Sequence, residues 1–313
     1  MSKVKCLIID EMFPNLVELL NEISVDADYQ PDFTRSELIA GIKGYEGLIV
    51  RSKTKINREV LDQADSLKFI ARAGAGIDNI DEDECARKGI IVLNAPEANR
   101  DAVGEHALGM LLSICHNIRQ GDQQVRKGIW DREGNRGWEI YGKTIGIIGY
   151  GNMGSAFARR LAGFSCNIIA YDKYKTGFGT DQVKEVDLQT IFEESDVLSL
   201  HVPLREDTNR MVDFEFLNQF HRPIILINSA RGKVVVLRDL LKAMNSSKVR
   251  AAALDVLENE KLDTLSDDET ADFNDLISRD NVLLTPHVGG WSFESYEKIN
   301  RILVRKIGDW LQR

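Results

Sequence analysis

The sequence predicts two α/β domains, each built on a doubly wound parallel sheet. Short apolar runs alternate with amphipathic stretches along the whole chain, as expected for strands that alternate with helices. A glycine-rich loop, Gly149-Tyr150-Gly151-Asn152-Met153-Gly154, lies between one such run and the next helical stretch. The length of 313 residues exceeds what a single hydrophobic core usually supports.

In the first part of the chain, four apolar runs are predicted to be buried strands. Two stretches with apolar residues at helical spacing, 14–23 and 83–88, are predicted to be helices. This alternation favours a parallel sheet covered by helices. The predicted strands are residues 5–10, 47–51, 67–71 and 90–93.

The second part begins with a predicted long helix at residues 101–118, followed by a loop-containing connector at 121–142. A second alternation then gives a six-stranded Rossmann unit. We expect the acidic stretch 258–280 to be loop-like, and 292–311 to be a helix that returns to the first domain. The six predicted strands are residues 143–148, 167–171, 197–201, 224–228, 250–255 and 282–284.

The composition restricts the classes of partner. A net charge of −9 would repel a nucleic-acid backbone. No apolar run approaches the roughly 18 residues of a membrane span, and no signal peptide is recognisable, so we expect a cytoplasmic protein with no membrane partner. The four cysteines lack the close spacing of disulfide or zinc sites, which predicts reduced thiols and no metal. They are Cys6, Cys85, Cys115 and Cys166.

The glycine-rich loop has the context of a dinucleotide-binding loop. It follows the predicted strand and opens a helix at residues 155–161. Gly149 would make the tight turn, Gly151 would let the backbone approach a pyrophosphate, and Gly154 would let helix and strand pack closely. The free N–H groups of the helix N-terminus would then bind the phosphate charges.

Asp172 supports this interpretation. It ends the next predicted strand, 18 residues after Gly154, near the position of the carboxylate that binds the adenine ribose. An ordinary glycine turn is the alternative, but strand, loop, helix and acid are all in register. A carboxylate there favours NAD, whereas Lys173 and Lys175 leave NADP as the alternative.

Three predicted strand ends carry groups suited to hydride transfer on a 2-hydroxy acid. His287 follows one of them and can take a hydroxyl proton near pH 7, although a structural histidine is the alternative. Arg231 follows a second strand and would polarise a carbonyl. Glu258 and Glu260 follow a third, and either could orient the base. Open α/β sheets bind ligands at these carboxyl ends.

The chain resembles the D-isomer-specific 2-hydroxyacid dehydrogenases over nearly its whole length. The resemblance rests on the glycine loop and on six further motifs in the same order along the chain. These are residues 73–81 (AGAGIDNID), 94–96 (NAP), 104–106 (GEH), 201–204 (HVPL), 228–232 (NSARG) and 285–290 (TPHVGG).

The resemblance implies a catalytic triad. Arg231 would bind the substrate carboxylate, His287 would exchange the proton, and Glu260 would favour the imidazolium form of His287. The proline that usually follows the acid is replaced by Lys261, which keeps Glu258 as the alternative. Trp291 is a second departure, because small or hydroxyl residues often stand there, and its bulk could narrow the site.

The resemblance also implies NAD as the cofactor, an NAD-binding Rossmann domain at residues 96–290, and a flavodoxin-like substrate-binding domain formed by 1–95 with 291–313. The expected cofactor contacts are Gly149, Gly151, Asn152, Met153, Gly154, Asp172, His201, Val202, Pro203, Thr208, Ser229, Ala230, Asp255, Gly289 and Gly290. The expected substrate contacts are Arg51, Ser52, Lys53, Ala75, Gly76 and Asn99.

Within the family, residues 51–54 most resemble the phosphate-binding loop of D-3-phosphoglycerate dehydrogenases, which act in serine biosynthesis. Such a loop can also shape a carboxylate pocket, so glyoxylate, hydroxypyruvate or another small 2-oxo acid is the alternative. NAD-sensing, partner-binding proteins of the same fold are an alternative of another class. Formate-type dehydrogenases resemble the chain too, but they carry Gln in place of Glu260, which disfavours that activity.

The resemblance further implies a homodimer through the helix at 101–118, and domain closure with hinges near 95–100 and 287–292. Because the sequence ends at Arg313, we expect no C-terminal serine-sensing domain.

Overall fold

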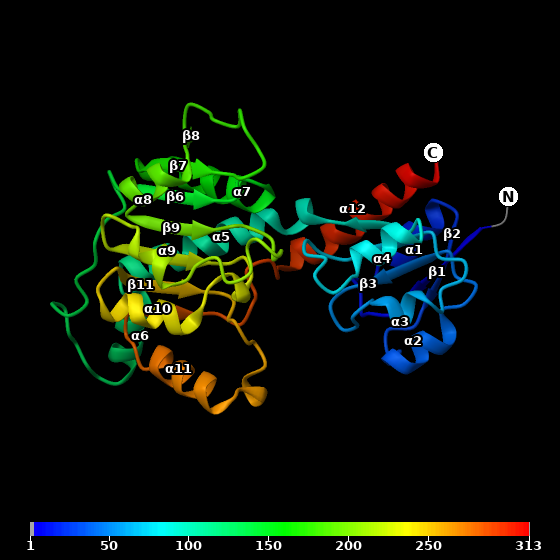
Figure 1. Ribbon diagram of the computed structural model, residues 1–313, viewed down its shortest axis with the longest axis horizontal. Coiled ribbons are helices and arrows are strands. Elements are labelled where there is room, and N and C mark those ends of the chain that lie inside the picture. The colour runs from blue at the N-terminus through cyan, green and yellow to red at the C-terminus, as the bar shows by residue number, and fades with distance from the viewer. Residues whose placement is uncertain (1–2, 313) are drawn as a thin grey trace. The chain divides into compact units, whose positions relative to one another are not determined.

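The computed structural model describes residues 3–312 and contains two parallel sheets, one in each of two units (Figure 1). Unit 1 comprises residues 1–100 and 291–313, and unit 2 comprises residues 101–290. The domain boundaries expected from the sequence, after residues 95 and 290, stay a prediction.

The sheet of unit 1 has the strand order β2-β1-β3-β4-β5, with every neighbouring pair parallel. This is the order of flavodoxin-like sheets, as predicted. The strands are β1 (Val4–Ile8), β2 (Val25–Tyr29), β3 (Gly47–Val50), β4 (Phe69–Arg72) and β5 (Ile91–Asn94).

Both faces of this sheet are buried. Cys6 and Ile8 of β1 pack in one hydrophobic cluster, whereas Leu7 between them packs in another. The first cluster includes Leu303 and Ile307, so the predicted C-terminal helix does return to unit 1. The helices of the unit are α1 (Leu16–Glu22), α2 (Arg35–Gly41), α3 (Arg58–Leu61), α4 (Glu82–Arg87) and α12 (Phe293–Leu311).

The sheet of unit 2 has the order β12-β11-β10-β9-β6-β7-β8 and is also parallel throughout. The order reverses between β6 and β9, which is the topological switch point where such sheets bind ligands. The strands are β6 (Thr144–Ile148), β7 (Asn167–Tyr171), β8 (Lys184–Glu185), β9 (Val197–Leu200), β10 (Ile224–Asn228), β11 (Val249–Leu254) and β12 (Val282–Leu284).

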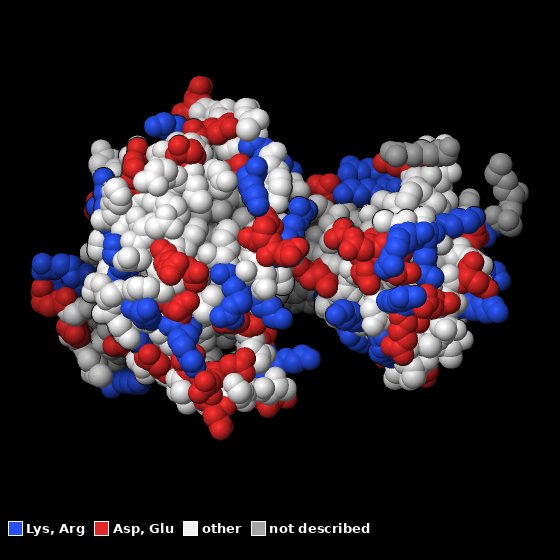
Figure 2. All heavy atoms as spheres, viewed as in Figure 1, with Lys and Arg blue, Asp and Glu red and all other residues white. Residues whose placement is uncertain are grey.

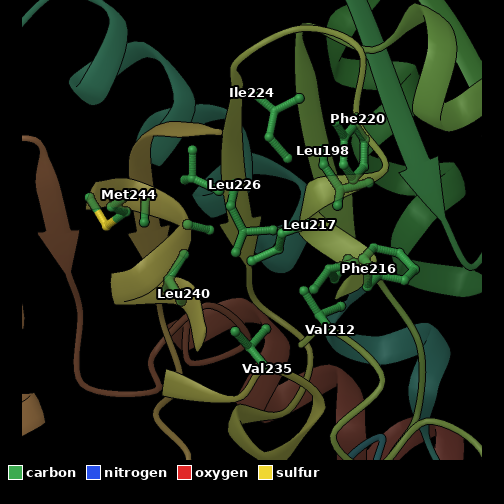
Figure 3. Close-up of a cluster of buried hydrophobic side chains, with 14 of the residues drawn as sticks. Leu198, Val212, Phe216, Leu217, Phe220, Ile224, Leu226, Val235, Leu240 and Met244 are labelled. Atoms are coloured by element: carbon green, nitrogen blue, oxygen red, sulfur yellow. The ribbon is translucent and has the colours of Figure 1, made fainter. Parts of the chain in front are cut away.

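Helices cover both faces of this sheet as well. Figure 3 shows one of the two cores, in which Leu198 of β9 and Leu226 of β10 pack with side chains of α9 (Phe214–Asn218) and α10 (Leu237–Asn245). The neighbouring residues Val197 and Ile225 belong to the cluster on the other face. The helices are α5 (Pro96–Cys115), which begins in unit 1, α6 (Ile118–Arg126), α7 (Asn152–Leu161), α8 (Leu188–Glu194), α9 (Phe214–Asn218), α10 (Leu237–Asn245) and α11 (Asp267–Ile277).

The prediction of a loop at 258–280 was wrong in its second half, which forms α11. Ser266 and Glu269 form a capping box at its start, and Asp267 and Asp268 also lie in the first turn. Carboxylates there interact favourably with the helix dipole, so the acidic composition that suggested a loop instead stabilises a helix start.

The long helix and its connector also differ from the prediction. Helix α5 begins at Pro96, a residue type favoured in the first helical turn, and ends at Cys115. Asn117 then adopts a left-handed conformation with φ of 52°, and α6 follows where we expected a connector. Strands β2 and β8 were not predicted, because both are edge strands with charged residues of low strand propensity.

Acidic and basic side chains are intermixed on the face of each unit seen in Figure 2. Among the described residues, no helix is long and apolar enough to cross a membrane. All four cysteines are free thiols, and Cys166 is the one that is not fully buried.

Candidate functional site

Three neighbouring strands of unit 2 bring the candidate catalytic residues to one edge of the sheet. Asn228 at the end of β10 pairs with Leu254 of β11, which pairs in turn with Leu284 of β12. Arg231, Glu260 and His287 lie in the three loops that leave these strand ends.

His287 and Glu260 are in contact. Nδ1 of His287 lies 2.9 Å from Oε2 of Glu260, and both side chains are about half exposed. Glu258, the alternative, is instead paired with Arg210 and accepts a hydrogen bond from the backbone N–H of Leu237. The geometry therefore favours Glu260 as the partner of the histidine, despite the Lys261 that follows it.

The backbone at His287 is held by Asp255. His287 has a left-handed conformation with φ of 55°, and its N–H donates to the carbonyl of Asp255 (2.8 Å). The Asp255 carboxylate accepts from Oγ1 of Thr285 (2.6 Å) and from the N–H groups of Val288 (2.9 Å) and Gly289 (2.8 Å). One buried carboxylate thus fixes both flanks of the histidine.

Asp255 stays ionised in this setting. Burial raises the pKa of Asp255. The hydrogen bonds from His106, Thr285 and the two N–H groups together lower it by more, so the net pKa lies below the ordinary value. His106 of α5 is a site neighbour that the sequence did not reveal. Its Nε2 lies 3.0 Å from Oγ1 of Thr285 and 3.3 Å from the Asp255 carboxylate.

The loop of Arg231 is ordered by Asn228, which is buried. Its Oδ1 accepts from the N–H of Ala230 (3.1 Å), and its Nδ2 donates to the carbonyl of Arg231 (3.1 Å). A Cβ at Gly232 would lie 1.7 Å from the carbonyl oxygen of Leu257, so only glycine fits. This close approach packs the Arg231 loop against the segment that leads to Glu260.

The glycine loop fits a bound dinucleotide. Gly149 has a φ of 91°, and a Cβ at Gly154 would lie 2.1 Å from the carbonyl oxygen of Gly149, whereas a Cβ at Gly151 would meet open space. Gly151 is the N-cap residue of α7. It has no side chain that could accept hydrogen bonds from the first turn of the helix, which contains Asn152 and Met153. These first-turn N–H groups remain for an anion in the space beside Gly151.

Asp172 closes the other side of this loop. Its Oδ2 accepts from the N–H of Tyr150 (2.8 Å), and its Oδ1 accepts from the N–H groups of Tyr174 (2.9 Å) and Lys175 (3.0 Å). Lys173, one of the two lysines that kept NADP as the alternative cofactor, forms an ion pair with Asp207 (2.5 Å). Its charge is therefore already partly neutralised.

The remaining expected cofactor contacts contribute unequally. The His201 imidazole is buried against Phe157 with Nε2 2.9 Å from Oγ of Ser199, so any contact of His201 with a ligand must come from its backbone. Thr208 is buried and donates to the carbonyl of Pro203 (2.6 Å), which orders the loop after β9 around Val202.

The hydroxyl of Ser229, next to Ala230, is buried without a partner in the described structure, which leaves hydrogen-bonding capacity for a ligand. Gly289 and Gly290 lie two and three residues after His287, in the same turn.

The expected substrate contacts lie in unit 1. The guanidinium of Arg51 lies over the rings of Trp291 and Tyr296, and Ser52 next to it is exposed. Lys53 donates from Nζ to the carbonyl of Pro31 (2.6 Å), and it lines a surface pocket together with Arg35.

Two of the other expected substrate contacts, Ala75 and Gly76, lie in the loop after β4. Asn94 donates to the carbonyl of Ala75 (2.6 Å). The N–H groups of Ala75 and Gly76 have no hydrogen-bond acceptor within residues 3–312, as an anion cradle requires. Oδ1 of Asn99 is buried and also lacks a partner there. No cluster suited to a metal ion occurs among the described residues.

Comparison with known proteins identifies close relatives. Residues 108–289 match the family described as D-isomer specific 2-hydroxyacid dehydrogenase, NAD binding domain. The chain is 36% identical to D-3-phosphoglycerate dehydrogenase of Methanocaldococcus jannaschii over 97% of this chain and 57% of that protein. It is 38% identical to hydroxypyruvate reductase of Thermotoga maritima over 96% of this chain and 94% of that protein.

The chain thus spans little more than half the length of the phosphoglycerate dehydrogenase relatives that it matches. Among solved structures, D-lactate dehydrogenase of Aquifex aeolicus, complexed with NAD and lactic acid, is 27% identical. It superposes with a TM-score of 0.84 over 98% of this chain and 95% of that one.

We predict that Asp172→Ser shifts cofactor preference toward NADP. The substitution removes a carboxylate that repels a 2′-phosphate and accepts from ribose hydroxyls, which should raise the NADP/NAD ratio of kcat/KM by about tenfold or more. The matched control is Asp181→Ser, an exposed acid of the same unit. An unchanged ratio in Asp172→Ser would show that this residue does not select the cofactor.

We predict that His201 makes the protein acid-labile. Burial lowers its pKa from 6.5 to about 4, so the unfolded chain binds a proton between these values and the folded chain does not. Stability is therefore lost as the pH falls from 6.5 toward 4, by about 3 kcal/mol in total. Urea unfolding at pH 7 and pH 4 should show this loss in the wild type and a smaller one in His201→Gln. Equal losses would contradict the assignment.

Proposed function

This chain belongs to the D-isomer-specific 2-hydroxyacid dehydrogenase family, and we propose that it interconverts a D-2-hydroxy acid and the matching 2-oxo acid with NAD. The observation that carries the proposal is the pair formed by His287 and Glu260, 2.9 Å apart at the carboxyl edge of the sheet in unit 2. Arg231 leaves the neighbouring strand end of the same edge. We assign NAD binding to unit 2 and substrate recognition to unit 1.

In this mechanism His287 moves the proton. An ionised Glu260 accepts from Nδ1–H of His287, which fixes the tautomer and leaves Nε2 as the base. During oxidation the substrate hydroxyl proton goes to Nε2, and Glu260 stabilises the imidazolium that forms. Bound NAD supplies the acceptor for the hydride that leaves the substrate carbon.

Arg231 supplies the positive charge of the mechanism. A guanidinium can bind the substrate carboxylate with two parallel hydrogen bonds, which orients the carbon that reacts. It also polarises the carbonyl oxygen of the 2-oxo acid during reduction. Its loop is rigid because Asn228 and the close approach at Gly232 leave it little room to move.

For the substrate, we propose 3-phosphoglycerate, with 3-phosphohydroxypyruvate as its oxidised partner. This oxidation begins serine biosynthesis. The support is the sequence Arg51-Ser52-Lys53 and the similarity to D-3-phosphoglycerate dehydrogenases. The similarity to hydroxypyruvate and glyoxylate reductases supports the alternative, a small 2-oxo acid without phosphate.

We also propose a homodimer. The resemblance implied an interface through the helix at 101–118, and we extend this interface to the following segment, 118–141 of unit 2. Large apolar side chains are exposed along this segment, and exposed apolar surface is a feature of protein–protein interfaces. These side chains are Ile118, Val125, Ile129, Trp130 and Tyr141.

The substrate proposal predicts NADH oxidation with 3-phosphohydroxypyruvate at a higher kcat/KM than with glyoxylate, hydroxypyruvate or pyruvate, measured by absorbance at a fixed salt concentration. A preference for hydroxypyruvate or glyoxylate would support the alternative substrate. NADH binding without turnover of any 2-oxo acid would support an NAD-sensing protein instead.

Glu260→Gln is the catalytic variant for this assay. It removes the charge that stabilises the imidazolium, so kcat/KM should fall by about a hundredfold and the pH limb of activity should move to lower pH. Glu258→Gln, two residues away, is the matched control and should retain the wild-type pH profile. The reverse result would transfer the role to Glu258.

The dimer predicts a mass of twice 35.3 kDa in light scattering, and a shift toward the single-chain mass in Trp130→Glu. Trp130 is 85% exposed in the single chain, so a charge at this position should not unfold the protein. A wild-type protein that scatters as a single chain would contradict the dimer.

A further inference from the structure

Arg51 has an unusual environment for a surface arginine. The centre of its guanidinium lies 4.4 Å from the ring centre of Trp291 and 5.0 Å from that of Tyr296. The two rings are neighbours, with centres 5.1 Å apart, and together form a platform under the cation. All three residues belong to unit 1.

The platform is itself anchored. Ser292 caps α12 through a reciprocal pair of hydrogen bonds with Ser295, which sets the first turn of the helix. Tyr296 in that turn donates from its hydroxyl to the carbonyl of Glu11 (2.9 Å) and packs edge-on against Phe13. The position of its ring is therefore fixed from both the helix and the loop after β1.

The backbone of Arg51 is fixed as well. Its N–H donates to the buried carboxylate of Asp10 (2.7 Å), and its carbonyl accepts from Nδ2 of Asn79 (3.0 Å). The guanidinium donates from Nη1 to the carbonyl of Glu11 (3.2 Å). Both ends of the residue are thus held, and the side chain has little freedom left to lose on binding a ligand.

The charge of Arg51 is not neutralised. Within residues 3–312 its guanidinium contacts a carbonyl, a phenol and two aromatic faces, and no carboxylate. Its Nη2 and Nε have no hydrogen-bond acceptor there. Stacking on an aromatic face leaves the edge of a guanidinium available, and that edge matches the geometry of a phosphate or carboxylate.

We propose that Trp291 and Tyr296 are positioning residues that hold Arg51 as the receptor for a second anionic group of the substrate. The substrate class is a 2-oxo acid that carries a phosphate or a second carboxylate at the end remote from the reacting carbon. This inference rests on the proposed dehydrogenase function. It gives Trp291, a departure from the family pattern, the role of selecting charge at the remote end.

The test compares Trp291→Leu with Trp291→Phe in steady-state reduction of two substrates by NADH. For 3-phosphohydroxypyruvate, loss of the indole should raise KM about tenfold with kcat nearly unchanged, because the contact orients Arg51 and touches no reacting atom. For glyoxylate, KM should stay within about twofold. Trp291→Phe keeps an aromatic face and should retain most of the wild-type KM.

Two further variants isolate the role of the platform. Phe293→Leu removes another aromatic side chain of the same segment, 92% exposed, and should change neither KM. In an Arg51→Lys background, which removes the planar guanidinium, Trp291→Leu should add little to the rise in KM. The dicarboxylate 2-oxoglutarate, compared with 3-phosphohydroxypyruvate, separates a carboxylate-selective from a phosphate-selective receptor.

Several results would overturn the inference while the dehydrogenase function stands. One is an equal rise in KM for glyoxylate, which would make Trp291 a general structural element. Another is a fall in KM for bulky neutral 2-oxo acids in Trp291→Leu, which would make the indole a steric wall. A third is a wild type with no preference for doubly charged substrates.

If no 2-oxo acid is reduced, the proposed function fails and the inference is tested separately. Calorimetric titration of the NADH-bound protein with 3-phosphoglycerate then provides the readout. Binding that weakens about tenfold in Trp291→Leu would support the receptor. Binding that is absent, or equal in the two proteins, would overturn it.

Discussion

The buried carboxylate of Asp255 is the interaction on which the candidate site of unit 2 depends. It accepts hydrogen bonds from a hydroxyl and two backbone N–H groups on both sides of His287. A buried charge is costly unless its hydrogen bonds are satisfied, and here the satisfying groups are those of the turn that carries the histidine. Any conformation that moved this turn would leave a buried charge unpaired. The stability of the fold and the orientation of His287 are thereby linked.

Other close contacts extend this order to the remaining candidate residues. Asn228 and Gly232 hold the Arg231 loop, and Asp172 holds the first residue after the turn glycine of the cofactor loop. In each case a short side chain at a strand end forms a hydrogen bond to the backbone, or a glycine lets a neighbouring backbone segment approach closely. The chemistry can then be carried by longer side chains that remain half exposed. This division of labour is a general property of parallel sheets, whose carboxyl ends all meet at one edge.

The parts of the molecule that follow from periodicity and turn chemistry could be predicted from the sequence. Both sheets, the cofactor loop and the three strand ends belong to this class, because buried parallel strands give continuous apolar runs and glycine motifs report local backbone demands. Strand β2 could not be predicted in this way, since its Asp26 and Asp28 disfavour a strand and only pairing with β1 explains it. Helix α11 was missed because an acidic stretch was interpreted by composition and not by its capping residues.

The contacts of His106 and Arg51 could not be predicted either, for a different reason. They join residues far apart in the sequence, 149 residues for His106 and Asp255 and 245 for Arg51 and Tyr296, and no local pattern encodes them. The choice between Glu258 and Glu260 also depended on contacts with residues far away in the sequence. The family pattern favoured one, and the structure gave the other a different partner, Arg210.

The left-handed backbone of His287 also bears on how an inactive form of this protein should be made. At a φ of 55°, alanine and especially β-branched residues are strained, so replacing the imidazole with them would disturb the turn as well as remove the base. Asparagine tolerates this conformation better than other non-glycine residues. An inactive protein for trapping a bound substrate is therefore best built with asparagine at this position. Its defects can then be attributed to the missing imidazole, and its backbone can still present Val288 and Gly289 to Asp255.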